Sequence, residues 1–465
     1  MAATEKGVWG LQDVRDKQLE NKWTYSSSPS ERTKLYVWGA NADGKLGLNQ
    51  QGPWSPEGTY LTARSSPTQL PGDYSAVAFG AGQLYTIKTD GTLWISGKNN
   101  DGALGMNQPV STTYSSPTQI GTGTNWARVV TTYSAVNAVK TDGTLWGWGQ
   151  NSAGQIGLKA RDKFSSPAQI GTDTNWSSPS KHISGAYYHT NAIRPTGYAP
   201  SAVGELWFWG NHGYGANGLN LGQTGSRSSP TQIGTVDNWI ACDSGTYTSY
   251  AINWDWNGTG DKKLYAWGWG GEGRLGLGNT NARSSPTQIG TGTDWSLVKG
   301  GAGMGFAIKT DGTLWSWGNN QGGKLGLNDN TQRSRPVQVG TDTDWSWLEC
   351  SHTTVFAQKT DDTLWSWGNN FEGMLGLNQA VSLKISSPTQ VGTDTTWGEV
   401  TPYGGWQGCS VIKTDGTLWI WGNNDNGATG QNSTNNGYSS PTQVPGTTWK
   451  RVTASGENGV WLKST

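Results

Sequence analysis

The stretch A-I-K-T-D-G-T-L-W-S-W-G-N-N-Q-G-G-K-L-G-L-N, residues 307–328, decides the fold. Its Asp311-Gly312 pair lies between the β-prone segments Ala307–Thr310 and Thr313–Trp315. A two-residue Asp-Gly loop between such segments is a strong hairpin signal, because its turn places both residues at positive φ. The sequence therefore predicts a β-hairpin here.

A two-residue turn fixes which side chains share a face of that hairpin. It would place Ile308 opposite Trp315 and Phe306 opposite Trp317, with Ala307 and Ser316 on the other side. Each sheet would then have a large aromatic face and a small-residue face, which suits stacking around a ring. Strands at Pro286–Ile289 and Trp295–Lys299 would complete a four-stranded unit.

The same unit recurs eight times along the 465 residues. An L-[WY]-x-x-G core begins at Leu35, Leu93, Leu145, Leu206, Leu264, Leu314, Leu364 and Leu418. A Ser-x-Pro element recurs with it, at Pro67, Pro117, Pro167, Pro230, Pro286, Pro336, Pro388 and Pro441. Successive cores lie 50 to 61 residues apart. Repeats of about this length are typical of solenoids and propellers.

The two ends of the repeat array complement each other. The tail Gly456–Lys463 matches Gly301–Lys309 and then stops, and Leu35–Gly39 supplies the missing partner strand. We therefore predict an all-β fold, a closed β-propeller over residues 35–465, whose last blade is closed by the N-terminal strand. Eight four-stranded blades are expected, and seven is the alternative if one repeat is too degenerate.

Composition limits the function. Lys plus Arg equals Asp plus Glu, 33 each, which argues against a nucleic-acid partner. The three cysteines, Cys242, Cys350 and Cys409, exclude a disulfide framework and show no metal-ligand spacing. The sequence indicates no signal peptide and no apolar run near the ~20 residues of a membrane span. No catalytic motif, metal site or cofactor site is apparent, so we expect no enzyme activity.

The W-G-x-N-x-x-G-x-L-G motif followed by Ser-x-Pro resembles the repeats of the regulator of chromosome condensation family. The resemblance covers about residues 35–465 and implies a propeller, although that family usually has seven blades. It includes exchange factors for a small GTPase, ubiquitin-ligase parts and a bacterial enzyme inhibitor. The resemblance therefore implies the fold without implying one function.

Residues 1–34 are not repeat sequence, and we predict an arm and linker there. The arm resembles N-terminal segments of tailed-phage virion proteins. Its apolar side chains would anchor it to other virion proteins, to copies of itself or to its own propeller. The candidate anchor residues are Val8, Trp9, Leu11, Val14, Leu19 and Trp23.

Loops that depart from the repeat are candidate receptor-binding sites. The fourth and fifth repeats carry Tyr198, Trp254 and Trp256 at equivalent turns, which are expected side by side on one face. The first repeat is extended at Gly52–Thr62, with Trp54 and Tyr60, in a loop expected to join neighbouring blades on the opposite face.

These observations favour a non-enzymatic phage tail or capsid display protein, made in the host cytoplasm and carried on the virion. Its loops would contact a host-surface glycan or protein. Two alternatives remain open. One is a cellular regulatory propeller, of the nucleotide-exchange-factor or enzyme-inhibitor type, that binds one protein partner. The other is a glycan-active enzyme. The receptor, the head or tail location and the oligomeric symmetry do not follow from the sequence.

Overall fold

The structure, a computed structural model, describes residues 33–464 except 51–61, 81, 133, 177–182, 186–188, 197–202, 212, 222–225, 257, 381, 404–407, 435–436 and 456–457. Within these ranges the chain consists of β-strands and five short 3₁₀ elements. No helix in the described ranges has the length and apolar character needed to cross a membrane.

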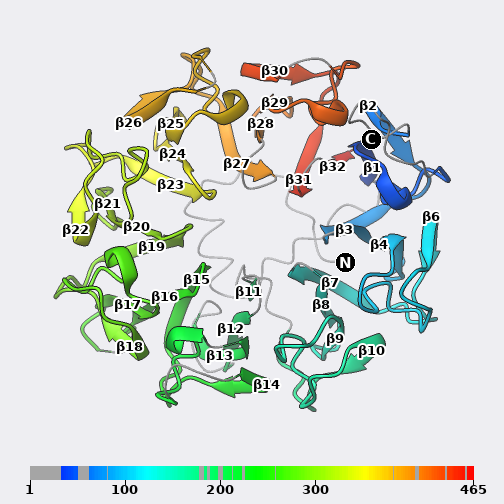
Figure 1. The fold of residues 1–465 in the computed structure, drawn as a ribbon, viewed down its shortest axis with the longest axis horizontal. Helices are drawn as coiled ribbons and strands as arrows, with labels where there is room; N and C mark the ends of the chain where they lie inside the picture. Colours follow the sequence, from blue (N-terminus) through cyan, green and yellow to red (C-terminus); the bar gives the residue numbers. More distant parts are fainter. Residues whose placement is uncertain are drawn as a thin grey trace, which may run out of the picture.

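The strands form eight four-stranded blades around a central channel (Figure 1). The innermost strands of the blades are β3(Tyr74–Phe79), β7(Trp126–Thr132), β11(Ile183–Gly185), β15(Trp239–Gly245), β19(Trp295–Gly300), β23(Trp345–Cys350), β27(Trp397–Tyr403) and β31(Trp449–Ser455). The second strands are β4(Gln83–Lys88), β8(Ala135–Lys140), β12(His189–Pro195), β16(Thr248–Trp254), β20(Met304–Lys309), β24(Thr354–Lys359), β28(Gly408–Lys413) and β32(Asn458–Ser464).

The third strands carry the L-[WY]-x-x-G core, and five of them are followed by a 3₁₀ element. They are β5(Leu93–Lys98), β9(Leu145–Gly149), β13(Gly204–Asn211), β17(Lys262–Gly268), β21(Leu314–Gly318), β25(Leu364–Asn369), β29(Leu418–Gly422) and β1(Thr33–Gly39). The outermost strands are β6(Thr113–Gln119), β10(Phe164–Gln169), β14(Ser226–Gln232), β18(Arg283–Gln288), β22(Arg333–Gln338), β26(Lys384–Gln390), β30(Tyr438–Val444) and β2(Arg64–Leu70). The 3₁₀ elements, which follow β1, β13, β17, β25 and β29 in that order, are η1(Ala42–Gly44), η2(Gly213–Gly215), η3(Gly271–Gly273), η4(Phe371–Gly373) and η5(Asp425–Gly427).

The innermost strands contact one another in succession from β3 to β31, and β31 contacts β3. The final sheet has the order β2-β1-β32-β31, in which Leu35 pairs with Leu462 and Gly39 with Asn458. The prediction of eight blades with a shared terminal blade is therefore confirmed, and the seven-bladed alternative is wrong. One backbone pair, Gly204 with Trp239, also links the β11–β14 and β15–β18 blades into a single eight-stranded sheet.

The predicted hairpin exists, but its predicted register was wrong by one residue. Ala307 lies opposite Trp315, and Ile308 lies opposite Leu314. The loop has three residues rather than two, since the Lys309 N–H still donates to the Thr313 carbonyl at 3.0 Å. Only Gly312 takes a positive φ, +79°. Such a loop is a type I turn followed by a left-handed residue, the next most common hairpin connection.

The shifted register explains the residue types of the motif. Asp311 Oδ1 accepts hydrogen bonds from the Thr313 amide (2.9 Å) and hydroxyl (2.7 Å), and Thr313 Oγ1 accepts one from Trp315 Nε1 at 2.9 Å. The same Asp–Thr–Trp chain of bonds forms at Asp90, Asp142, Asp361 and Asp415. Where Gly is replaced by Asp362, that residue takes φ +60°, as the turn requires.

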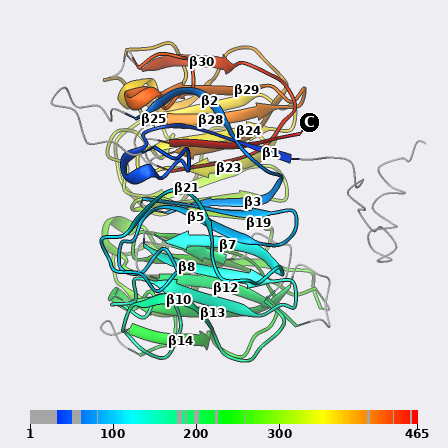
Figure 2. The same ribbon diagram turned by 90° about the vertical axis from the view of Figure 1, so that its right-hand side faces the viewer.

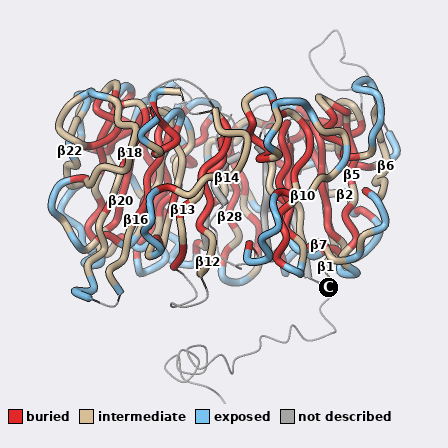
Figure 3. The backbone as a smooth tube through the Cα atoms, turned by 90° about the horizontal axis from the view of Figure 1, so that it is seen from below, coloured by how far each residue is buried: buried red, intermediate tan, exposed pale blue. Residues whose placement is uncertain are grey.

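The register also corrects the predicted faces. Trp317 shares its face with Gly305, and Phe306 lies on the other face. A Cβ on Gly305 would come within 2.4 Å of the Trp317 ring, so the indole lies directly across that glycine. Trp317 then packs edge-on against Tyr250 of the preceding blade, and Phe306 packs against Trp367 of the next blade. The core consequently lies between blades (Figure 3).

The second half of the motif fastens each blade to the next. Trp317 Nε1 donates to the Arg274 carbonyl of the preceding blade at 2.9 Å. Gly273, at φ +72°, lies so close to the following blade that a Cβ would meet Ser334 Cα at 2.6 Å. The repeated Gly, Trp and Ser positions are thus blade-packing residues, and they carry no information about the function.

Candidate functional site

The propeller has two faces, which we name by their connections. The loop face carries the 3₁₀ elements and the turns between first and second strands. The turn face carries the Asp-Gly turns and the links between blades. Exposed residues gather along both edges of the ring in side view (Figure 3). β1 begins and β32 ends at the turn face (Figure 2).

Two of the predicted binding residues lie on the turn face. Trp254 ends β16 and is half-buried, with Lys262 Nζ 5.4 Å from its ring centroid. Trp256 lies in the following turn and is 38% exposed. Its backbone N–H donates to the Trp254 carbonyl at 2.9 Å. This turn is closed by Asp255, whose carboxylate accepts from the Thr259 amide and hydroxyl.

The other predicted site residues lie outside the described ranges. They are Val8, Trp9, Leu11, Val14, Leu19, Trp23, Trp54, Tyr60 and Tyr198. The prediction that the loop carrying Trp54 joins neighbouring blades was wrong, because the strands on its two sides, β1 and β2, pair within one blade.

On the loop face, the middle residues of two 3₁₀ segments contact the next blade. In the β15–β18 blade this residue is Glu272, whose Oε1 accepts a hydrogen bond from Asn319 Nδ2 of the next blade at 2.7 Å. In the β11–β14 blade the middle residue is Tyr214, and its ring stacks on Trp269 of the next blade. The two contacts are made from equivalent positions, but one is a hydrogen bond and the other is an aromatic stack.

Tyr214, Tyr247 and Trp269 form an aromatic group that we call the rim cluster. Tyr214 is stacked on Trp269 with ring centroids 5.4 Å apart, and it meets Tyr247 edge-on at 5.6 Å. Tyr214 is 45% exposed and Tyr247 is 37% exposed. Exposed, touching aromatic side chains are the residue types that dominate protein–protein interface energies.

Both tyrosines hold strained backbone conformations. Tyr214 has φ +59° and Tyr247 has φ +60°, in the left-handed region that bulky residues rarely adopt. The residue that corresponds to Tyr214 is Asp43 or Asn426 in two blades and Glu272 or Glu372 in two others, and Gly303 corresponds to Tyr247. Asp, Asn and Gly tolerate a positive φ better than Tyr does, while Glu272 and Glu372 take φ +60° and +52°. Strain of this kind costs of order 1–3 kcal/mol per residue and gathers at functional sites.

A buried cation supports the cluster from below. The Arg274 guanidinium lies 3.8 Å from the Trp269 ring centroid, on a side chain that is only 5% exposed. It donates to Glu272 Oε2 at 2.5 Å and to the Thr246 carbonyl at 3.3 Å. Because Arg274 is already paired, it holds Trp269 in place and leaves the surface of the cluster neutral.

The sequence reasoning missed this cluster. A signal was present, since Tyr214 stands where the other repeats have a non-aromatic residue, namely Asp43, Asp101, Ala153, Glu272, Gly322, Glu372 and Asn426. The predicted sites were chosen by loop length instead, which selected Tyr198, Trp254 and Trp256 on one face and Trp54 and Tyr60 on the other.

The channel wall carries a row of alternating charges on three successive innermost strands: Asp243, Lys299 and Glu349. Lys299 Nζ donates to Glu349 at 2.7 Å, and Asp243 accepts from the Gly300 amide at 2.8 Å. Burial alone would lower the pKa of Lys299, but Glu349 and Asp243 raise it above its ordinary value. Burial likewise raises the pKa of the Glu349 carboxyl, against the effect of Lys299.

This pairing satisfies the charges and offers no activated nucleophile. Burial and the neighbouring carboxylates raise the pKa of Cys350, so its thiol is unreactive at neutral pH. Among the described residues, no group of three or more His, Cys, Asp or Glu side chains is arranged to hold a metal ion.

The comparisons with known proteins agree on the type of repeat. The model of the regulator of chromosome condensation (RCC1) repeat matches residues 142–193, 261–308 and 311–358. The regulator of chromosome condensation of Xenopus laevis is 23% identical over 294 residues, 60% of this chain and 65% of that protein. A secretion-regulating guanine nucleotide exchange factor of Bos taurus is 27% identical over 124 residues, 27% of this chain and 26% of that protein.

The fold comparison agrees. Prp20p of Saccharomyces cerevisiae, a yeast RCC1 whose structure was described with its binding to Gsp1p and histones, superimposes with a TM-score of 0.57 at 15% identity. The alignment covers 93% of this chain and 92% of Prp20p. The chain matches at most about two thirds of the length of these curated relatives, and the structural similarity at this identity shows the fold.

These findings correct the predicted function. The virion display protein was the leading interpretation, and it is wrong, because the relatives are cellular regulators, not phage proteins. The interpretation depended on a short arm outside the described residues. The expectation of a non-enzyme is supported in part, since these relatives are named as a regulator and an exchange factor. Three matches to the RCC1 repeat model and the matching ring of blades show that the chain folds as a β-propeller similar to those of RCC1 proteins.

Proposed function

We propose that this protein is a regulatory propeller that binds one protein partner through its loop face, over the β11–β14 and β15–β18 blades. The rim cluster of Tyr214, Tyr247 and Trp269 is the observation that carries the proposal. Two of its rings are exposed, Arg274 supports Trp269 from below, and both tyrosines hold a positive φ.

The relatives suggest the class of partner. A guanine nucleotide exchange factor among them acts on a nucleotide-binding protein, so a small GTPase is the first candidate. The neutral cluster would supply the apolar centre of the interface. The surrounding polar loops would form its rim.

Binding to a panel of purified small GTPases tests the proposal. Each GTPase is presented in GDP-bound and nucleotide-free form, and release of a fluorescent GDP analogue is followed in parallel. We expect at least one GTPase to bind the propeller, with tighter binding of the nucleotide-free form if the propeller promotes exchange.

The informative variant is the double substitution Tyr214→Asn with Tyr247→Gly, because Asn and Gly suit the left-handed backbone at these positions. Loss of both rings is expected to weaken binding at least about tenfold, the effect of a hot spot worth more than about 1.4 kcal/mol. The matched control is Trp256→Ala on the turn face, which should leave affinity unchanged. Equal losses from both variants, or no binding by any GTPase, would contradict the proposal.

A further inference from the structure

Four cations lie on the loop face where the β7–β10 blade meets the β11–β14 blade. Lys159, Arg161 and Lys163 precede β10 and are exposed, and Arg227 lies near the start of β14. The backbone N–H of Lys159 donates to the Ser228 carbonyl, so the two loops meet across the junction of the blades. None of the four cations makes an ion pair with a described residue. We call them the basic group.

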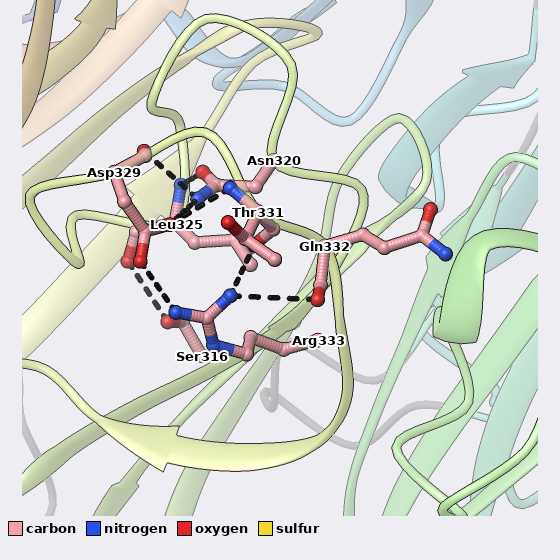
Figure 4. A network of polar contacts seen from close by, with 7 residues as sticks. All are labelled: Ser316, Asn320, Leu325, Asp329, Thr331, Gln332 and Arg333. Atoms are coloured by element: carbon pink, nitrogen blue, oxygen red, sulfur yellow. Dashed lines mark hydrogen bonds and ion pairs between the residues drawn. The ribbon is translucent and has the colours of Figure 1, made fainter.

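The cation equivalent to Arg227 is neutralised in another blade. Arg333 and Arg227 both stand three residues before the proline of their strands. Figure 4 shows the Arg333 guanidinium beside Asp329, with Nη2 2.5 Å from Oδ2. In the β11–β14 blade, Leu221 stands where the other blade has Asp329, and residues 212–225 include no Asp or Glu. The charge of Arg227 is therefore not compensated by its own loop.

The loops of the loop face differ in charge around the ring. In the loops of the two blades that form the basic group, residues 150–163 and 212–225, Asp162 is the only acidic residue. The β23–β26 blade lies across the ring, and its corresponding segment contains Glu372 as well as Lys384 (Figure 1). The corresponding loop of the β27–β30 blade contains Asp425 and no cation. The excess positive charge is therefore local to one side of the loop face.

The turn face has the opposite character. It carries an exposed aspartate at five of its hairpin turns, namely Asp90, Asp142, Asp311, Asp361 and Asp415. Hydrogen bonds from the neighbouring threonines lower the pKa of these carboxyls, so they are charged at neutral pH. An acidic molecule would be repelled from this face and attracted to the basic group, so the two faces together would orient its approach.

Lys159 occupies a backbone position that suits a lysine poorly. Its φ is +63°, in the left-handed region. The corresponding residues of the other blades are Asn49, Asn107, Asn220, Gly278, Asn328, Asn378 and Asn432. Asn and Gly adopt this conformation more readily than Lys.

The lysine also gives up a hydrogen bond that an asparagine makes at this position. Asn220 Oδ1 accepts a bond from Ser284 Oγ of the next blade at 3.1 Å, and Asn107 Oδ1 accepts one from Ser165 Oγ at 2.9 Å. An ammonium group has no acceptor, so Lys159 cannot accept the equivalent bond from Ser228. A residue that fits its own fold less well than the common alternative indicates a role outside that fold.

The basic group and the rim cluster share the β11–β14 blade, which supplies Arg227 to the first and Tyr214 to the second. We infer that the loop face binds an acidic surface of a protein partner, whose carboxylates lie against the basic group. This inference rests on the proposed function, because one partner would cover both places. Nucleic acid fits less well, since it is usually bound by a continuous basic stripe and the basic group is local.

A partner-independent probe tests the basic group. Binding of a fluorescently labelled deca-glutamate peptide is measured by anisotropy at about 20 mM and about 150 mM salt. The double substitution Arg161→Gln with Lys163→Gln should weaken binding about three- to tenfold at the lower salt, and less at the higher. The matched control is Lys384→Gln, at the position of Lys163 in the blade across the ring, and it should leave affinity unchanged.

Lys159→Asn separates binding from structure, because its two expected effects differ in sign. Asn suits the left-handed backbone and can accept a hydrogen bond from Ser228, so the thermal midpoint should rise by about 1–2 °C. Affinity for the peptide should fall about two- to fivefold, the range of one exposed ion pair. A lowered midpoint, or an unchanged affinity, would show that Lys159 serves the fold and would overturn its assignment to the site.

The rim-cluster variant, Tyr214→Asn with Tyr247→Gly, should leave peptide binding unchanged, so failure of the rim cluster and failure of the basic group are distinguishable. Peptide binding that depends on Lys159 and Arg161, without binding by any GTPase, would refute the proposed partner class alone. The inference is overturned if the peptide does not bind, if Lys384→Gln weakens binding as much as the double substitution, or if a short DNA duplex binds more tightly than the peptide at about 150 mM salt.

Discussion

Trp38 Nε1 donates a hydrogen bond to the Ala428 carbonyl at 3.0 Å across 390 residues of sequence. The same bond joins Trp148 to Ala103 and Trp421 to Met374 between blades that are neighbours in the chain. The joint that closes the ring is therefore chemically the same as the internal joints. The closing joint also contains a backbone bond, in which the main-chain N–H of Asn432 donates to the Ser65 carbonyl at 2.6 Å.

Trp38→Phe tests the closure. The substitution keeps an aromatic ring but leaves the buried Ala428 carbonyl without its donor, so we expect a loss of about 1–3 kcal/mol in the free energy of unfolding. Trp148→Phe is the matched control at an internal joint, and it should cost a similar amount in urea denaturation. A large loss from Trp148→Phe with none from Trp38→Phe would mean that the ring is open at the termini.

Stability should fall when a turn glycine is replaced by Ala and rise when a non-glycine residue at the equivalent turn is replaced by Gly. Gly312→Ala places a Cβ 2.1 Å from the Thr343 carbonyl oxygen at φ +79°, so we expect it to destabilise the protein by more than about 1 kcal/mol. Asp362→Gly relieves a positive φ at the equivalent turn and should stabilise by up to about 1 kcal/mol. Thermal midpoints that move in the same direction for both variants would contradict the turn assignment.

His189 should make stability depend on pH between 6.5 and 4. Burial lowers its pKa to about 4, so the folded state keeps the ring neutral while the unfolded state protonates near pH 6.5. Stability is therefore fully present above pH 6.5 and is lost as pH falls toward 4. His189→Met, which copies Met304 at the equivalent position, should flatten this part of the urea-midpoint profile. Parallel profiles for the two proteins would show that His189 is not the group responsible.

A separate acid dependence should appear at lower pH. Hydrogen bonds from Thr313 lower the pKa of Asp311, and the same holds for Asp415 with Thr417. These carboxylates stabilise the fold above their unfolded pKa near 4, and their contribution is lost as pH falls through the lower folded value. Thr313→Val removes the hydroxyl donor and should reduce the slope of the urea midpoint below about pH 4. An unchanged slope would contradict this role for the Asp–Thr pair.

The rim cluster should trade stability for binding. Tyr214→Asn and Tyr247→Gly each remove a left-handed tyrosine, worth about 1–2 kcal/mol, and lose a ring contact worth about 0.5–1.5 kcal/mol. We therefore expect an unchanged or raised thermal midpoint in the double variant that loses partner binding. A fall of many degrees would indicate that the tyrosines serve packing, which would remove the reason for assigning them to an interface.

The repeat motif was sufficient to predict the ring, because its Gly, Trp, Ser and Pro positions are the residues that join blades. The motif was not sufficient to predict which residues pair across the hairpin of the second and third strands. A two-residue and a three-residue Asp-Gly loop are written with the same letters, and only the Lys309–Thr313 backbone bond separates them. One residue of difference moved Phe306 and Trp317 to opposite faces.

The rim cluster was not predicted from the sequence for a related reason. Tyr214, Tyr247 and Trp269 are separated by up to 55 residues in sequence and meet only because adjacent blades bring a third-strand loop and a first-strand turn together.

Hydroxyl-radical footprinting of the propeller with its bound partner tests the central claim most directly. Tyr214 and Tyr247 on the loop face and Trp256 on the turn face are all exposed aromatic side chains, so each should be oxidised in the free protein. The account predicts strong protection of both tyrosines in the complex and unchanged oxidation of Trp256. Protection of Trp256 with continued oxidation of Tyr214 and Tyr247 would contradict it.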